Sequence, residues 1–175
     1  LIKGMPVIHI ELKKSGDSVS QATEQIKKYA QEGVFTGLFS LVQVFVAMTP
    51  DKTLYFANPG DNPFNDKFFF HWADFNNEEY TSWEKVVEKL LSIPMAHKLI
   101  GFYTVPDAGD GTLKVLRSYQ YYAVEAINNR IAKAQWTSKD RLGGYICHTT
   151  GSGKTLTSFK AAQLVSRSKK VDKAV

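Results

Sequence analysis

Six residues near the end of the sequence have the types and order needed to bind phosphate. Residues 150–155 read TGSGKT and follow the short apolar segment 144–148. Glycines let successive backbone N–H groups turn toward one anion, and a helix beginning at Lys154 adds its dipole. Lys154 would then reach the β and γ phosphates, and Thr155 would bind the accompanying Mg²⁺. The sequence predicts an ATP-binding loop formed by Thr150, Gly151, Ser152, Gly153, Lys154 and Thr155.

Residues outside this loop bear on the same prediction. The position of the usual first glycine is occupied by His148, a departure that is common in the helicase superfamily whose loop reads T-G-S-G-K-T. Upstream, VLRSYQYYAVEAI places Arg117 and Gln120 near the start of a predicted helix. A glutamine amide offers a donor and an acceptor that match the N6 and N7 edge of adenine. Arg117 and Gln120 are therefore predicted to bind ATP; the alternative is a glycine turn beside an ordinary surface lysine.

A different chemistry is indicated by VIHIELKK, near the start of the sequence. Alternation along this predicted strand places Glu11 and Lys13 side by side on one face. The opposite face carries Ile8, Ile10 and Leu12 and is expected to be core. A carboxylate held in this way can bind Mg²⁺, and the neighbouring lysine can orient a water or stabilise charge on a phosphate under attack.

A helix is predicted to follow at residues 18–31, and it strengthens the interpretation of Glu11 and Lys13 as a catalytic pair. Gln25 and Tyr29 lie one turn apart on it. A strand with E-x-K followed by a helix with Q-x-x-x-Y resembles the PD-(D/E)xK nucleases, in particular their RecB-like branch. The resemblance implies that Gln25 and Tyr29 brace the catalytic lysine side and contact the DNA backbone. The alternative is a surface ion pair and a half-buried tyrosine. His9 shares the Glu11 face, but without a nearby Cys or second His it is predicted to be an ordinary residue.

The remaining pattern predicts an α/β chain with two parts. A cluster of Pro, Gly and Asp at residues 105–113 marks the seam, so residues 1–108 are predicted to be one domain and residues 109–175 the start of another. Further strands are predicted at 41–49 and 53–58, paired as a hairpin, and at 68–73 and 143–149. Further helices are predicted at 81–93, 117–135 and 154–166.

Charge and composition limit the class of protein. Residues 1–113 carry 10 Lys/Arg and 14 Asp/Glu, whereas residues 114–175 carry 12 Lys/Arg and 3 Asp/Glu. This basic excess favours phosphate-bearing partners, although it also fits a solvated surface. No apolar run is long enough to span a bilayer, so no membrane partner is expected. The single cysteine, Cys147, excludes an internal disulfide and fits a reducing cytoplasm.

Together, the E-x-K strand, LRSYQ and GGYICHTTGSGKTLTSFKAAQL resemble the restriction (R, motor) subunit of type I restriction–modification enzymes. The resemblance implies a fold: a PD-(D/E)xK (RecB-like) nuclease core with a mixed sheet and flanking helices, then the first strand, P-loop and helix of a RecA-like helicase domain. It implies ATP-dependent translocation and Mg²⁺-dependent cleavage of double-stranded DNA in a bacterial or archaeal cytoplasm. Its implied partners are methyltransferase (M) and specificity (S) subunits.

In the resembled family a metal-binding Asp precedes the E-x-K strand, and an acidic segment that completes ATP hydrolysis follows the P-loop. Neither is found here, so residues 1–175 are expected to be an inactive fragment that can self-associate through the exposed sheet edge of its motor part. Two alternatives remain open. One is a fragment of another nuclease–helicase fusion in DNA repair or phage defence. The other is a non-catalytic interaction fragment.

Overall fold

The computed structural model describes residues 1–133, 143–168 and 171, and contacts divide the chain into two compact units. Unit 1 comprises residues 1–117, and unit 2 comprises residues 118–175. The seam at residues 105–113 lies inside unit 1, where it forms most of a small hairpin. The predicted mixture of small sheets and helices is confirmed.

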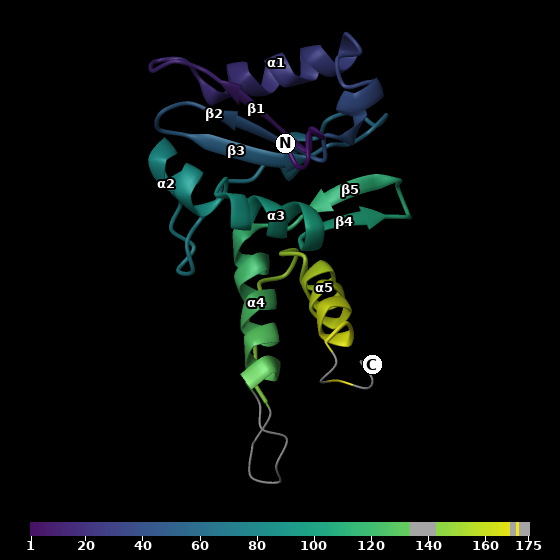
Figure 1. Ribbon diagram of the computed structural model, residues 1–175. Helices are drawn as coiled ribbons and strands as arrows, with labels where there is room; N and C mark the ends of the chain where they lie inside the picture. Colours follow the sequence, from purple (N-terminus) through teal and green to yellow (C-terminus); the bar gives the residue numbers. More distant parts are fainter. Residues whose placement is uncertain (134–142, 169–170, 172–175) are drawn as a thin grey trace. The chain divides into compact units, whose positions relative to one another are not determined.

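Unit 1 is built on a three-stranded mixed sheet with the order β1-β2-β3 (Figure 1). β1 (Ile8–Leu12) pairs in parallel with β2 (Val44–Met48), and β2 pairs antiparallel with β3 (Thr53–Ala57) as the predicted hairpin. Parallel neighbours need a long crossover connection. Helix α1 (Val19–Gln31), followed by the 3₁₀ turn η1 (Gly37–Leu41), supplies it.

Local sequence signals fix both ends of α1. The Ser18 hydroxyl caps its start by accepting from the Ser20 N–H at 3.2 Å. At its end, Gly33 adopts φ 75°, its N–H donates to Ala30, and the Val34 N–H donates to Tyr29. This pair of bonds is a Schellman motif, which favours glycine because the backbone is left-handed there. The helix therefore begins and ends as predicted, apart from one residue at its start.

The face of the sheet that α1 covers holds a hydrophobic cluster. On α1, Val19, Ala22 and Ile26 form an apolar stripe that is buried against β2 and β3. The whole cluster consists of Val19, Ala22, Ile26, Val42, Phe45, Ala47 and Phe56. In the β1–β2 register His9 is opposite Phe45 and Glu11 is opposite Ala47. Paired residues project from the same face, so His9 and Glu11 lie on the side that α1 covers.

This placement corrects the prediction for the two faces of β1. The face with Ile8, Ile10 and Leu12 was expected to be core. Instead, Ile10 and Leu12 are 43% and 64% exposed. The reason is that β1 stands at the end of the strand order, so only part of its far face is shielded by the elements that bury β2 and β3.

The other face of β2 and β3 packs against the second half of unit 1. Tyr55 is fully buried, donates its hydroxyl to the Leu116 carbonyl at 2.9 Å, and meets the Trp72 ring edge-to-face at 5.5 Å. Helices α2 (Trp83–Lys89) and α3 (Ile93–Phe102) precede the hairpin of β4 (Thr104–Asp107) and β5 (Thr112–Val115). The helix predicted at 81–93 is therefore shorter, and α3 and the hairpin were not predicted.

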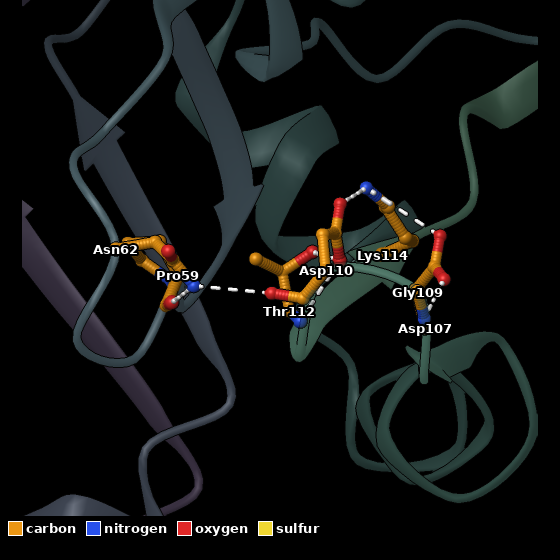
Figure 2. A network of polar contacts seen from close by, with 7 residues as sticks. All are labelled: Pro59, Asn62, Asp107, Gly109, Asp110, Thr112 and Lys114. Carbon is orange, nitrogen blue, oxygen red and sulfur yellow. Dashed lines mark hydrogen bonds and ion pairs between the residues drawn. The ribbon is translucent and has the colours of Figure 1, made fainter.

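The β4–β5 turn is held by a compact polar network (Figure 2). Asp110 accepts hydrogen bonds from Lys114 and from both the hydroxyl and the backbone N–H of Thr112. These bonds lower the pKa of the Asp110 carboxyl to about 2. Asn62 donates to the Asp110 carbonyl at 3.3 Å, which ties the turn to the loop after β3. The acidic residues of the seam thus stabilise a turn.

Two predicted strands are wrong. Residues 68–73 form no strand: the 3₁₀ turn η2 (Asp66–Phe68) is followed by single bridges, Tyr55 with Phe70 and Ala73 with Glu79. Residues 143–149 also form no strand, and Tyr145 is 91% exposed. A strand in this position needs a neighbour to pair its backbone groups, and none is present among the described residues. Self-association through a sheet edge at these residues therefore has no structural basis.

The described part of unit 2 contains two helices packed against each other, α4 (Ser118–Lys133) and α5 (Lys154–Ser166), and the segment that leads into α5. Both helices were predicted; residues 134–135 of the predicted first helix lie outside the described residues. α5 begins directly after Gly153, as the phosphate-loop prediction requires. Within the part of the chain that the structure describes, no helix has the length and apolar character needed to cross a membrane.

Candidate functional site

Glu11 and Lys13 form an ion pair on the α1-covered side of the sheet edge. The Lys13 Nζ lies 3.0 Å from Glu11 Oε1, and the two side chains are 24% and 15% exposed. Strand alternation brings them to the same side, and the lysine follows the last residue of β1. A partly shielded carboxylate and ammonium are therefore held together at a position that solvent reaches.

His9, which the sequence did not single out, is the third polar residue of this face. Its Nε2 lies 3.8 Å from Glu11 Oε2, too far for a hydrogen bond, and has no hydrogen-bond partner among the described residues. Its ring packs edge-to-face against Phe35 at 5.2 Å and Phe45 at 6.1 Å. Burial lowers the pKa of His9, and the nearby Glu11 carboxylate partly opposes that shift. The imidazole therefore sits beside Glu11 mainly in its neutral form at neutral pH.

The two predicted α1 residues are placed differently with respect to the pair. The Tyr29 ring meets the His9 ring edge-to-face at 6.2 Å, so Tyr29 is connected to Glu11 through the histidine. Gln25 is half-buried one turn earlier and forms no hydrogen bond through its side chain with the described residues. The i, i+2 spacing of His9 from Glu11 predicted that the two share a face, but not that His9 packs against Tyr29.

The residues present fit a hard divalent cation that keeps most of its water. Mg²⁺ is typically held by one or two carboxylates and several waters, and Glu11 supplies one carboxylate. No group of three or more His, Cys, Asp and Glu side chains with metal-binding geometry occurs among the described residues. Glu11 can therefore supply one ligand to a divalent cation, and the Lys13 ammonium lies beside it at 3.0 Å.

In unit 2 the predicted phosphate loop is a closed turn ahead of α5. Gly151 and Gly153 adopt φ 76° and 82°, which favours glycine at both positions. Three groups converge on the Thr149 carbonyl: the Ser152 N–H at 3.3 Å, the Ser152 hydroxyl at 2.7 Å and the Lys154 ammonium at 3.2 Å. The lysine is therefore folded over the loop rather than directed away from it.

Two side chains of α4 donate hydrogen bonds to the end of the loop that directly precedes α5. The Tyr119 hydroxyl donates to the Ser152 carbonyl at 2.7 Å, and the Gln120 amide nitrogen donates to the Gly153 carbonyl at 3.0 Å. Tyr119 was not among the predicted site residues, and Gln120 was predicted to read adenine rather than to hold the loop. A tyrosine at this position carries no sequence signal that separates a loop contact from ordinary packing.

The remaining predicted nucleotide residues lie in different surroundings. Thr155 is exposed in the first turn of α5. Thr150 and Gly151 are exposed within the loop. Arg117 is the last residue of unit 1, and its guanidinium carbon lies 4.5 Å from the centroid of the Phe70 ring.

The loop has the polarity that an anion requires. The N–H groups of Gly151, Gly153 and Lys154 have no backbone acceptor among the described residues, whereas the carbonyls of Thr149, Ser152 and Gly153 are occupied. Orphan N–H groups at a helix start, together with an adjacent lysine, suit a phosphate. The residues present therefore fit the phosphates of a nucleotide.

Comparison with known families places these two regions. Residues 1–64 match the family described as the type I restriction enzyme R protein N terminus, and residues 119–175 match the SWI2/SNF2 ATPase family. The first match contains β1, α1 and the Glu11–Lys13 pair, and the second contains the glycine loop and α5.

Relatives cover the whole chain. It is 36% identical over 100% of its length to the endonuclease subunit of type I restriction enzyme SauCOLORF180P of Staphylococcus aureus strain COL, and 37% identical to that of SsaAORF53P of Staphylococcus saprophyticus. It spans 18% of each of those relatives. The subunit of EcoprrI from Escherichia coli is 33% identical over 80% of this chain and 45% of that relative. Over its whole length the chain is therefore similar to type I restriction-enzyme endonuclease subunits, as its motifs predicted.

Proposed function

We propose that this chain forms part of the ATP-dependent DNA-translocating and DNA-cleaving subunit of a type I restriction enzyme, with a PD-(D/E)xK nuclease site and an ATP-binding P-loop. The observation that carries the proposal is the presence of both sites on one chain, each within the matching family segment. The Glu11–Lys13 pair lies in the restriction-subunit segment, and the TGSGKT loop lies in the ATPase segment. The whole protein is then a type I site-specific deoxyribonuclease.

In the nuclease part, each residue of the acid–lysine face has a role that its position supports. Glu11 would hold Mg²⁺, which supplies Lewis-acid activation of the phosphodiester. Lys13, with its ammonium 3.0 Å from the same carboxylate, would orient the attacking water or stabilise charge on the phosphate. Gln25 and Tyr29 on α1 would support this side of the site and contact the DNA backbone. Tyr29 is the better placed of the two, because it packs on His9 beside Glu11.

In the motor part, the loop and its supports would bind ATP. The N–H groups of the glycine loop and the Lys154 ammonium would receive the phosphates, and Thr155 would bind the Mg²⁺ of the nucleotide. Arg117 and Gln120 would bind the adenine end. For Lys154, phosphate replaces the neutral Thr149 carbonyl with an anion, so the attraction between opposite charges is added to the hydrogen bond. That exchange favours release of the lysine from Thr149 when phosphate arrives.

The proposed partners follow from the family. Double-stranded DNA would be the substrate, and methyltransferase and specificity subunits would complete the assembly. The predominance of Lys and Arg in residues 114–175, 12 against 3 Asp and Glu, supports contact with nucleotide or DNA phosphates.

The test uses the full-length subunit with its partner subunits, circular duplex DNA, ATP and Mg²⁺. Glu11→Ala is expected to abolish cleavage and spare ATP hydrolysis, whereas Lys154→Ala is expected to abolish both. Glu32→Ala, an exposed acid at the end of α1, and Lys133→Ala, at the end of α4, are the matched controls and should leave both activities intact. Normal cleavage by Glu11→Ala would overturn the nuclease assignment and favour a docking module in its place.

A further inference from the structure

Tyr119 contacts both ends of the glycine loop. Its hydroxyl donates to the Ser152 carbonyl at 2.7 Å, one residue before the last glycine. Its ring meets the His148 ring edge-to-face, with centroids 5.5 Å apart and an interplanar angle of 84°. His148 stands where such loops usually have their first glycine. One aromatic side chain of α4 therefore packs on the start of the loop and hydrogen-bonds near its end.

The hydrogen bond to Ser152 determines the direction of the next N–H group. In a planar trans peptide the C=O of one residue and the N–H of the next point in opposite directions. Tyr119 draws the Ser152 carbonyl toward α4, so the N–H of Gly153 must point away from α4. Gln120 contacts both carbonyls. Its amide nitrogen donates to the Gly153 carbonyl at 3.0 Å, which directs the N–H of Lys154, and it makes a longer contact of 3.4 Å with the Ser152 carbonyl.

We propose that Tyr119 is a positioning residue for nucleotide phosphates: by holding the Ser152 carbonyl, its hydroxyl keeps the Gly153 N–H directed at the bound anion. This inference rests on the proposed ATP-binding function of the loop. Tyr119 itself touches no phosphate in this scheme. Preorganisation of this kind strengthens binding because the loop does not need to be ordered when the ligand arrives.

His148 has a part in the same arrangement. A glycine at that position would remove the edge-to-face contact that the His148 ring makes with the Tyr119 ring. Aromatic pairs prefer the observed edge-to-face geometry. The departure from the usual glycine is thus matched by a tyrosine on the neighbouring helix.

The test measures nucleotide affinity of the full-length subunit carrying Tyr119→Phe, which keeps the ring and removes only the hydroxyl. ATP, pyrophosphate and adenosine are each titrated as competitors of a fluorescent ATP analogue. Without this neutral hydrogen bond the loop must be ordered when the ligand binds, which limits the loss of affinity to roughly fivefold. We expect a change of that size for ATP and for pyrophosphate, and no change for adenosine, which has no phosphate. Tyr122→Phe, a half-buried tyrosine one turn along α4, is the control and should leave all three affinities as in wild type.

The possible results separate this inference from the proposed function. If wild type does not bind ATP, or Lys154→Ala binds it normally, the proposed ATP site fails. If Lys154→Ala loses ATP binding while Tyr119→Phe binds ATP and pyrophosphate like wild type, only the positioning role of Tyr119 is overturned. Equal weakening of adenosine binding, or the same loss in Tyr122→Phe, would also overturn it, because either result indicates a general change in α4.

Discussion

The close approach of Gln120 to Gly153 leads to a prediction that needs no nucleotide. A Cβ on Gly153 would lie 2.6 Å from the Gln120 amide nitrogen, and the residue has φ 82°. Gly153→Ala therefore combines the cost of a left-handed non-glycine residue, about 1–2 kcal/mol, with the loss of a Gln120 hydrogen bond, about 1 kcal/mol. The expected destabilisation of this helix start is about 2–3 kcal/mol.

The assay is amide hydrogen exchange of the nucleotide-free chain, followed at Thr157. The Thr157 N–H donates to the Gly153 carbonyl at 3.2 Å, so its exchange reports opening of the first turn of α5. Gly153→Ala should accelerate this exchange about 30- to 140-fold, since 1.4 kcal/mol is a factor of ten. Gly151→Ala is the matched control: its φ is 76°, but an added Cβ meets no atom within 4 Å. Gly151→Ala should accelerate Thr157 exchange only by the factor for the left-handed backbone, about 5- to 30-fold.

A double-mutant cycle isolates the contribution of Gln120. In a Gln120→Ala background the clash is absent, so Gly153→Ala should cost only the left-handed backbone, about 1–2 kcal/mol. If Gly153→Ala accelerates exchange by the same factor in both backgrounds, Gln120 does not approach Gly153 and the packing argument is refuted.

Two further predictions concern unit 1. Burial lowers the pKa of His9 below its ordinary value of 6.5, so an NMR titration should show His9 protonating below pH 6.5. Because unfolded His9 binds its proton at the ordinary pKa, stability should fall as pH drops below 6.5, and His9→Asn should lessen that fall; a His9 pKa of 6.5 or higher would contradict this. Phe45 is fully buried with its ring 4.7 Å from Phe35, so Phe45→Ala should lower the free energy of unfolding by about 3–5 kcal/mol in urea. The exposed control Phe39→Ala should cost under about 0.5 kcal/mol; equal costs would argue against the cluster.

The elements that could be predicted are those whose signals are local. α1 has its cap at Ser18, its apolar stripe and its terminal Gly33, all within one short stretch of sequence. The two strands of the β2–β3 hairpin are likewise joined by a turn at Pro50 and Asp51, a local signal. By contrast, the apolar residues 143–148 would be a strand only beside other strands, because a strand satisfies its backbone groups through neighbours. Periodicity does not report whether such neighbours exist.

The candidate sites show the same difference between features fixed by local sequence and features that depend on distant residues. The side-by-side position of Glu11 and Lys13 follows from strand alternation alone, and the structure has them 3.0 Å apart. Which face they share with α1 depends on where the crossover returns, and alternation does not contain that information. His9 was set aside because no Cys or second His lies near it in the sequence. Its contacts with Tyr29, Phe35 and Phe45 involve residues distant in sequence, which the pattern does not report.

In both proposed sites a lysine ammonium contacts a nearby oxygen, but the charge of that oxygen differs between the two sites. Lys154 rests on the neutral Thr149 carbonyl at 3.2 Å, and a phosphate is a stronger partner, so ligand binding itself favours its release. Lys13 rests on the Glu11 carboxylate at 3.0 Å, which is already a charged partner. A cation on Glu11 would compete for the same carboxylate and weaken its attraction for the lysine. In the proposed nuclease, Mg²⁺ binding would therefore prepare Lys13 for the phosphate, and the P-loop lysine would need no such preceding step.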